Sequence, residues 1–282
     1  MPASPTIFRT VDDLRATLVG WRRDGLRIAL VPTMGALHEG HLDLVRAARA
    51  RADRVVVSIF VNPTQFGPKE DFGSYPRTEA GDVDKLAALG VEAVFAPNAA
   101  EMYPEGHATT ISLAGPALGL ETDFRPHFFA GVATVVGKLL IAVMPDIAVF
   151  GEKDYQQLMV VRRLVRDLRL PTEIVGLPTV REGDGLALSS RNAYLSAEER
   201  TLATTIARVM RTTADAIRAG GAVEPALAEG RATLETAGFR VDYLVLRNAD
   251  TLAELVDAAT EPRRMLAAAW LGKTRLIDNI AV

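Results

Sequence analysis

Apolar residues over roughly the first 180 positions follow two different spacings along the chain. Short continuous apolar runs predict buried strands at 27–31, 54–60, 92–95, 147–150 and 173–176. Apolar positions three or four residues apart predict helices at 41–51, 78–89, 132–143 and 155–168. Strands that alternate with helices indicate a parallel sheet with helices on both faces, so the expected class is α/β with a Rossmann-like, doubly wound sheet.

The pattern changes near Val180, where strands and helices no longer alternate. After a polar loop, alanine-rich segments predict two helices at 196–218 and 224–237. Strand-like runs follow at 241–247, 265–270 and 275–280. This is an α+β pattern, and it predicts a Rossmann-like domain at 1–178 and a smaller C-terminal α+β domain at 179–282 that acts as a lid.

Polar segments follow the predicted strands at four places in the chain. These segments are 32–41, 62–66, 151–157 and, after the last strand of the first domain, 189–191. In an open α/β sheet, ligands bind at the carboxyl ends of the strands. We therefore expect the four segments to meet at one edge of the sheet and to form a single ligand site.

The first of these segments contains two histidines, His38 and His41, at the start of a predicted helix. A helix N-terminus suits phosphate because it offers free N–H groups and a positive dipole end. Gly40 lies between the histidines, and its missing side chain would let a flat purine approach the backbone. A zinc-binding His-Glu-x-x-His helix needs its histidines four residues apart, so their spacing of three disfavours zinc. Taken alone, the pair could equally be two ordinary histidines at a helix start.

Two further segments carry positive charge after a strand. Lys153 would bring an ammonium group to the sheet edge, and Asp154 could cap the next helix or contact a ribose hydroxyl. Ser189, Ser190 and Arg191 combine hydroxyl groups with a guanidinium, which suits phosphate binding. In isolation, helix capping and an exposed turn explain these residues as well as a nucleotide does.

Two neutral amides complete the candidate site. Gln65 and Gln157 each follow a predicted strand and could hydrogen-bond a small polar substrate. An amide can orient a carboxylate without the full charge of an arginine, which leaves the carboxylate nucleophilic. Without the surrounding motifs, either glutamine could be a solvated side chain.

The composition limits the possible partners. Hydrophobic residues make up 49% and charged residues 24% of the 282 positions, as in globular proteins. The net charge of −3 gives no electrostatic reason to expect nucleic acid or an anionic membrane. The lack of cysteine excludes disulfides and thiolate chemistry and fits a reducing compartment. With no signal pattern and no long apolar stretch, we expect a cytoplasmic protein.

Together these motifs resemble the pantoate–β-alanine ligase family, whose members are nucleotidyltransferases with a His-x-x-His motif. The similarity covers nearly the whole chain and is strongest at 32–41, 60–66, 75–78, 150–157 and 178–196. It implies that the carboxylate of (R)-pantoate attacks the α-phosphorus of ATP, which gives pantoyl-adenylate and pyrophosphate. The amine of β-alanine then attacks the acyl carbon, which gives pantothenate and AMP. The resemblance also implies a homodimer through the N-terminal domain.

The resemblance assigns residues to each ligand. The implied ATP-binding residues are Met34, Gly35, Ala36, Leu37, His38, Glu39, Gly40, His41, Gly151, Glu152, Lys153, Asp154, Val180, Leu188, Ser189, Ser190 and Arg191. Gln65 and Gln157 would hold pantoate, and Gln65 would also contact β-alanine. His41 is implied as the catalytic histidine.

A carboxylate that attacks a polyanion must overcome charge repulsion. We expect the negative charge of the phosphates to be neutralised jointly by His38, His41, Lys153, Arg191 and a Mg²⁺ carried with ATP. Mg²⁺ keeps its waters and uses few protein ligands, so no protein metal site is expected. The Gly- and Pro-containing segment 67–75 is expected to cover the adenylate and exclude water.

One segment departs from the family pattern, which is Arg-Pro-Gly-His-Phe-Arg-Gly-Val. Here the chain reads Arg125-Pro126-His127-Phe128-Phe129-Ala130-Gly131-Val132. His127 therefore stands in place of the glycine, Phe128 in place of the histidine and Ala130 in place of the arginine. Either His127 supplies an imidazole from the neighbouring position, or that role is dispensable.

Two other functions are compatible with the same motifs. One is a nucleotidyltransferase that transfers AMP to a phosphorylated metabolite, but such an acceptor favours arginine or lysine where Gln65 and Gln157 stand. The other is a protein that binds nucleotide without catalysis. Retention of Lys153, Arg191 and both histidines argues against it.

Overall fold

The computed structural model describes residues 4–68, 70–257 and 260–282. Its contacts divide the chain into two compact units. The first consists of Met1–Gly151 and Val160–Leu177, and the second of Glu152–Met159 and Pro178–Val282. The short piece Glu152–Met159 thus groups with the C-terminal residues. The proposed role of the C-terminal part as a lid stays a prediction.

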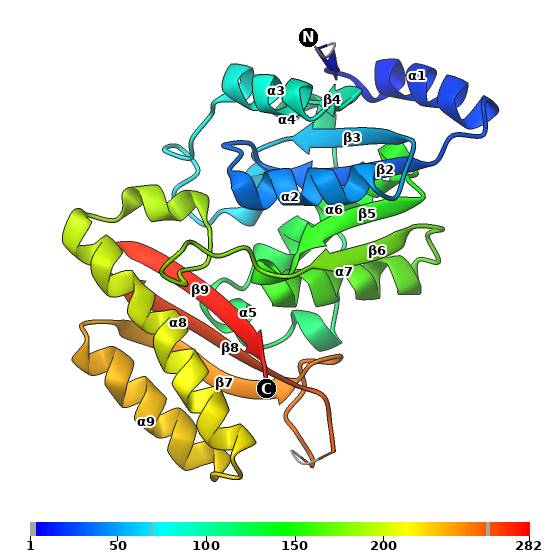
Figure 1. The fold of residues 1–282 in the computed structure, drawn as a ribbon. Coiled ribbons are helices and arrows are strands. Elements are labelled where there is room, and N and C mark those ends of the chain that lie inside the picture. Colours follow the sequence, from blue (N-terminus) through cyan, green and yellow to red (C-terminus); the bar gives the residue numbers. More distant parts are fainter. Residues whose placement is uncertain (1–3, 69, 258–259) are drawn as a thin grey trace. The chain divides into compact units, whose positions relative to one another are not determined.

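The first unit is built on a six-stranded parallel sheet, as the alternating pattern predicts (Figure 1). Its strands are β1 (Thr6–Phe8), β2 (Ile28–Thr33), β3 (Arg54–Ile59), β4 (Ala93–Phe95), β5 (Ile147–Gly151) and β6 (Glu173–Leu177). They lie in the order β1-β4-β3-β2-β5-β6. The chain therefore winds outward in one direction from β2 to β4 and in the other from β5 to β6, which confirms the doubly wound fold class.

Helices cover both faces of this sheet (Figure 1). They are α1 (Val11–Arg23), α2 (Glu39–Arg49), α3 (Glu79–Ala88), α4 (Ala99–Met102), α5 (Glu121–Phe124), α6 (Phe128–Val143) and α7 (Tyr155–Asp167). Short 3₁₀ turns are η1 (Pro63–Gln65), η2 (Gly115–Ala117) and η3 (Glu152–Asp154). The helix α2 packs on β2, β3 and β5, whereas α6 packs on β2 and α1. Most side chains of α6 are buried, because its sequence is apolar on all sides.

Some boundaries differ from the sequence prediction. The strand β2 continues through Pro32 to Thr33 instead of ending at Pro32. Its pairing with β5 covers only Ala29 and Leu30, so the missing N–H of Pro32 lies beyond the segment that β5 pairs. The helix α6 begins at Phe128, four residues before the predicted start, because Gly131 made its first turn look irregular.

The N-terminal elements β1 and α1 are absent from the predicted set. A local signal for α1 does exist in the sequence. Thr10 caps the helix by accepting a hydrogen bond from the Asp13 N–H, and Leu14 and Leu18, four residues apart, are buried. The strand β1 has only three residues and pairs at the sheet edge with β4, which is too short a stretch to give a periodic pattern.

The second unit combines three antiparallel strands with two helices, as the α+β pattern predicts (Figure 1). The elements are η4 (Ser190–Tyr194), α8 (Ala197–Arg218), α9 (Val223–Thr236), β7 (Arg240–Asn248), β8 (Arg263–Leu271) and β9 (Thr274–Ala281). Ser196 and Glu199 form a capping box at the start of α8. Leu244, Met265 and Leu276 of the sheet pack against the two helices in one apolar core.

The contact between α6 and η1 leaves no room for a side chain at Gly131. A Cβ there would lie 2.4 Å from the carbonyl oxygen of Thr64. We therefore expect Gly131→Ala to lower the free energy of unfolding by about 1–3 kcal/mol, the usual cost of overpacking. The matched control is Gly81→Ala in α3, where a Cβ meets nothing within 4 Å. Urea titration of both variants tests this, and equal stabilities would contradict the assigned contact.

Candidate active site

Three neighbouring strands carry the predicted motifs of the first unit at their carboxyl ends. The strands β3, β2 and β5 are adjacent in the sheet, and the order of the chain reverses between β2 and β5. Such a switch point is where open α/β sheets bind ligands. The segment from Met34 to His41 follows β2, η1 with Gln65 follows β3, and Gly151 ends β5. The predicted convergence of these three segments is therefore present in the topology of the sheet.

The loop after β2 is held by a buried carboxylate on α3. The N–H groups of Ala36 and Leu37 each donate to Asp82 at 2.8 Å, and Asp82 is fully buried. Gly35 has a φ of +82°, and a Cβ there would lie 3.2 Å from Asp82 Oδ2. Only glycine combines this backbone conformation with such a close approach. Asp82 thus sets the path of the predicted ATP loop.

The backbone N–H groups that could donate to a phosphate lie at the start of α2. Within the described chain, Gly35 N–H donates to Thr33 Oγ1, and Ala36 and Leu37 donate to Asp82. The N–H groups of Glu39 and Gly40 occupy the first two positions of α2, where an α-helix offers no internal acceptor. These two amides, with the dipole of α2, form the anion-binding end of the helix.

The two histidines lie together at this helix start. His38 is the N-cap residue and His41 the third helical residue, and their ring centroids are 4.1 Å apart. Nδ1 of His41 accepts a hydrogen bond from the His38 N–H at 3.4 Å. In the neutral ring the proton of His41 therefore resides on Nε2, which is then a hydrogen-bond donor. Helix geometry thus fixes both the place and the tautomer of this imidazole.

Gln65 is fixed by a buried polar network. Its Oε1 accepts from Asn62 Nδ2 at 3.1 Å, and its Nε2 lies 3.1 Å from the sulfur of Met34. Asn62 is itself buried, donates to the carbonyl of Gly131 and accepts from the Tyr103 hydroxyl at 2.7 Å. The predicted residues Met34 and Gln65 are therefore in contact. The side-chain amides of Asn62 and Gln65 are neutral, and a cation that contacts this cluster is Arg125, which donates to the backbone carbonyl of Gln65 at 3.2 Å.

Asn62, Asp82 and Tyr103 have no assigned role in the sequence analysis. Asn62 lies inside a predicted polar segment, and its position beside Pro63 at a strand end was the available signal. Burial raises the pKa of Tyr103, and a hydrogen bond with Thr64 opposes that effect. Asp82 and Tyr103 come from elements distant in sequence, so only the fold brings them to the loops.

The segment that departs from the family pattern contacts the predicted covering segment 67–75. Arg125 donates to both carboxylate oxygens of Glu70, and its guanidinium lies 3.9 Å from the ring centroid of Phe128. His127 Nε2 is 3.9 Å from Glu70 Oε1. Burial, the largest effect, raises the pKa of Glu70, but Arg125, the Gly67 N–H and His127 together lower it below its ordinary value. The altered segment thus anchors Glu70.

The remaining predicted residues belong to the second unit. Lys153 lies in η3, where its Nζ is 3.8 Å from Asp154 Oδ1. Gln157 is half-buried in the first turn of α7.

The segment from Val180 to Arg191 is folded back on itself within the second unit. Leu188 N–H donates to the Val180 carbonyl at 3.0 Å, and Ser189 caps η4 by accepting from the Arg191 N–H at 3.3 Å. Arg181 forms a double ion pair with the buried Asp278 of β9. The predicted residues Val180, Leu188 and Ser189–Arg191 are therefore brought into one compact turn.

Two broader features bear on possible ligands. Among the described residues, no group of three histidine, aspartate or glutamate side chains is arranged to hold a metal ion. No helix in the described ranges is long and apolar enough to cross a membrane.

A doubly wound sheet with phosphate-suited loops at its carboxyl edge defines the class of nucleotide-binding α/β proteins. A sequence model of the pantoate-beta-alanine ligase family matches residues 6–281. The chain therefore belongs to the pantoate–β-alanine ligase family, as the motifs predict. It is 58% identical over 277 residues to a pantothenate synthetase of Rhodospirillum rubrum, covering 98% of each chain. It is 59% identical over 283 residues to pantothenate synthetase 2 of Bradyrhizobium diazoefficiens, covering 100% of each.

Solved structures show the same similarity. Pantothenate synthetase from Thermus thermophilus superposes with a TM-score of 0.91 at 48% identity, over 97% of this chain and 98% of that one. The pantoate–β-alanine ligase from Francisella tularensis, complexed with β,γ-ATP and β-alanine, gives a TM-score of 0.84 at 34% identity, over 98% and 97%. The predicted fold and enzyme class are thus confirmed.

Replacement of Asp82 tests the support of the loop after β2. Asp82→Asn keeps one acceptor but turns an NH₂ group toward a backbone N–H, so one charge-assisted hydrogen bond is lost. We expect unfolding to become easier by about 2 kcal/mol, since hydrogen bonds to charged groups contribute about 1.5–3 kcal/mol. Asp84→Asn, on an exposed position of the same helix, is the control. Chemical denaturation with indistinguishable midpoints for the two variants would refute the role of Asp82.

The lowered pKa of Glu70 predicts a pH effect. A carboxylate whose pKa is lower in the folded state stabilises the fold above its unfolded pKa of about 4.3, and this contribution is lost as pH falls through the folded value. We expect wild type to exceed Glu70→Gln in stability by about 1 kcal/mol at pH 7, since the pair is partly solvated. The difference should shrink below about pH 4. A difference that stays constant from pH 7 to pH 3 would contradict the assignment.

Proposed function

We propose that this chain catalyses the reaction of its family: ATP-dependent condensation of (R)-pantoate with β-alanine to pantothenate, AMP and pyrophosphate through a pantoyl-adenylate. The match of the family over residues 6–281 carries this conclusion. The placement of His38 and His41 at the N-terminal end of α2, and of Gln65 in contact with Met34 of the loop before it, supports it from the geometry.

The first unit supplies an anion site and a carboxylate site. The amides of Glu39 and Gly40 and the Nε2–H of His41 would donate to phosphate oxygens. Gln65 would orient pantoate and contact β-alanine through an amide that Asn62 holds in place. A neutral binding group leaves the pantoate carboxylate its negative charge, so that it stays nucleophilic toward the α-phosphorus. Donors placed before the reaction are effective because they need no reorganisation as charge develops.

The second unit would supply most of the positive charge. Lys153 and Arg191 would neutralise phosphate oxygens, with Ser189 and Ser190 as hydroxyl donors and Gln157 as a second ligand of pantoate. The remaining residues of the proposed ATP site are Met34, Gly35, Ala36, Leu37, Gly151, Glu152, Asp154, Val180 and Leu188. In this proposal the second unit acts as a lid that closes on the nucleotide and excludes water from the adenylate.

We assign Mg²⁺ to the nucleotide rather than to the protein. The described residues contain no three-ligand acidic or histidine cluster, a donor set that fits a metal held mainly by phosphate oxygens and water. When bound, Mg²⁺ would withdraw charge from the phosphates and stabilise pyrophosphate as it leaves.

The proposal includes a location and an assembly. A cytoplasmic enzyme is expected because ATP, the proposed substrate, is a cytoplasmic metabolite. A homodimer through the first unit is expected from the family resemblance, and a monomer mass in sedimentation equilibrium would contradict it.

A transferase acting on a phosphorylated acceptor is the alternative in the same class of fold. The neutral side chain of Gln65 disfavours it, because its side-chain contacts with Asn62 and Met34 provide no cation for a phosphate. The other alternative, nucleotide binding without catalysis, would be excluded by any measured conversion of ATP to AMP.

The decisive assay uses purified protein with pantoate, β-alanine and Mg-ATP. AMP and pyrophosphate should form in equal amounts, and only when pantoate is present. Release of ADP, or AMP release that does not depend on pantoate, would overturn the proposed function.

Replacement of Lys153 tests the assigned charge. Lys153→Ala should lower the rate of pantoate-dependent pyrophosphate release about a hundredfold, the typical effect of removing one donor from such a site. Thermal unfolding should change little, since the polar contact of the ammonium group among the described residues is a 3.8 Å contact with Asp154. Lys273→Ala, at an exposed position of the same unit, is the control. Near-normal AMP release by Lys153→Ala would remove Lys153 from the mechanism.

A further inference from the structure

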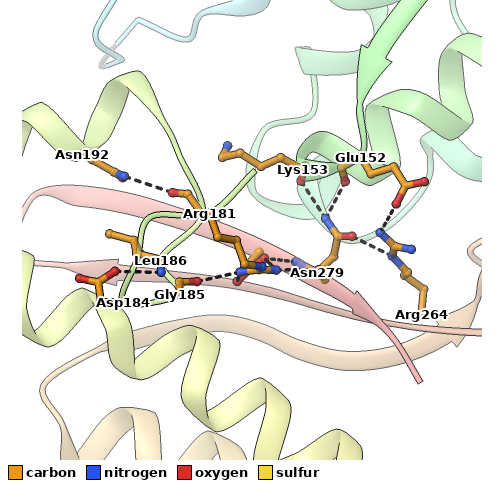
Figure 2. A network of polar contacts seen from close by, with 11 residues as sticks. Glu152, Lys153, Arg181, Asp184, Gly185, Leu186, Asn192, Arg264 and Asn279 are labelled. Carbon is orange, nitrogen blue, oxygen red and sulfur yellow. Dashed lines mark hydrogen bonds and ion pairs between the residues drawn. The ribbon is translucent and has the colours of Figure 1, made fainter. Parts of the chain in front are cut away.

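Asn279 of β9 contacts the backbone that carries Lys153. Its side-chain amide donates two hydrogen bonds, one to the carbonyl of Glu152 and one to the carbonyl of Lys153, each of 2.8 Å (Figure 2). The Asn279 side chain is buried, with 3% of its surface exposed. One asparagine therefore binds two consecutive peptide groups of η3 in a place that water cannot reach.

Arg264 of β8 holds Asn279 and the same turn. Its Nε donates to Asn279 Oδ1 at 2.8 Å, and its terminal nitrogen donates to Glu152 Oε2 at 2.9 Å (Figure 2). The guanidinium also lies 4.0 Å from the ring centroid of Tyr155. All four residues belong to the second unit. The donor face of Asn279 is thus directed toward η3 because Arg264 occupies its acceptor.

The turn η3 needs such support because of its place in the chain. It is a single 3₁₀ turn between the end of β5 and the start of α7, and short 3₁₀ turns have poor internal hydrogen bonds. The direction in which a lysine side chain leaves the backbone depends on the orientation of its own peptide group and the preceding one. These are the two peptide groups that Asn279 binds.

We propose that Asn279, oriented by Arg264, is a positioning residue that directs the ammonium group of Lys153 toward the nucleotide phosphates in the adenylation step. This inference rests on the function proposed above for Lys153. In this role Asn279 acts through η3. It therefore affects the formation of the adenylate and not the later attack by β-alanine.

The neighbouring residue on β9 has the same kind of role for the other phosphate-suited turn. Asp278 is buried and accepts from Arg181 at 2.7 and 2.8 Å, and Arg181 also donates to the carbonyl of Gly185. The ion pair with Asp278, the largest effect, raises the pKa of Arg181. The consecutive residues Asp278 and Asn279 of β9 thus support both turns of the second unit.

The test replaces Asn279 by an isosteric group that cannot donate. Asn279→Asp keeps the acceptor for Arg264 but presents a carboxylate oxygen to two carbonyls. We expect the rate of pantoate-dependent ATP–pyrophosphate exchange to fall at least tenfold and the KM for ATP to rise. The KM for β-alanine should stay within twofold of wild type. An unchanged exchange rate would overturn the inference.

A double-mutant cycle separates positioning from general damage. If Asn279 acts through Lys153, Lys153→Ala combined with Asn279→Asp should be no slower than Lys153→Ala alone. If the rate losses of the two single variants instead multiply in the double variant, the inference is overturned and the proposed role of Lys153 still stands. A Lys153→Ala variant with normal adenylation would instead refute the proposed function of Lys153, whatever the result for Asn279.

The control is Asn248→Asp on β7. Asn248 also uses its amide to hold a nearby group in the same unit, with Nδ2 donating to Glu261 Oε2 at 2.6 Å. This variant should lose a comparable amount of thermal stability but keep normal exchange. If Asn279→Asp does not fold, Asn279→Ala replaces it in the same cycle with the same expected outcomes. Equal exchange rates for the control and the Asn279 variant would count against the inference.

Discussion

Every backbone group that leaves a strand of the sheet loses its ladder partner and must find another, because a buried unpaired amide or carbonyl is costly. In this protein the predicted functional segments begin where strands end, so the constraint falls on the site itself. Buried polar side chains provide the new partners. Asp82 accepts from the loop after β2, Asn62 accepts from the Thr64 N–H of η1, and Asn279 donates to η3.

These three side chains explain how the loops can be irregular and still rigid. Each binds backbone groups as well as side chains, so it orients the residues that are proposed to carry the chemistry. Asp82 leaves the amides of Glu39 and Gly40 as the anion-binding end of α2. Rigid placement of donors is what electrostatic catalysis requires, since donors that must reorganise during the reaction stabilise the transition state less.

The altered segment near α6 shows how the fold accommodates a departure from the family pattern. Phe128, in place of the family histidine, receives the guanidinium of Arg125, and His127 lies beside Glu70. The segment therefore holds Glu70 through its ion pair with Arg125, whose guanidinium packs against the ring of Phe128. Neither alternative offered by the sequence, a displaced imidazole or a dispensable one, includes this anchoring role.

The sequence by itself determined most of the longer elements, the parallel sheet and the family, but not β1 and α1. Apolar spacing reports burial directly, and motifs such as that of His38 and His41 are continuous in the chain. Only the tertiary structure revealed Asp82, Asn279 and the split of the chain at η3. These features join residues far apart in sequence, and a single aspartate or asparagine has no periodic pattern that could indicate its partner. The residues proposed for the chemistry stand in motifs that are readable from the chain, whereas the contacts of Asp82 and Asn279 depend on the packing of distant elements.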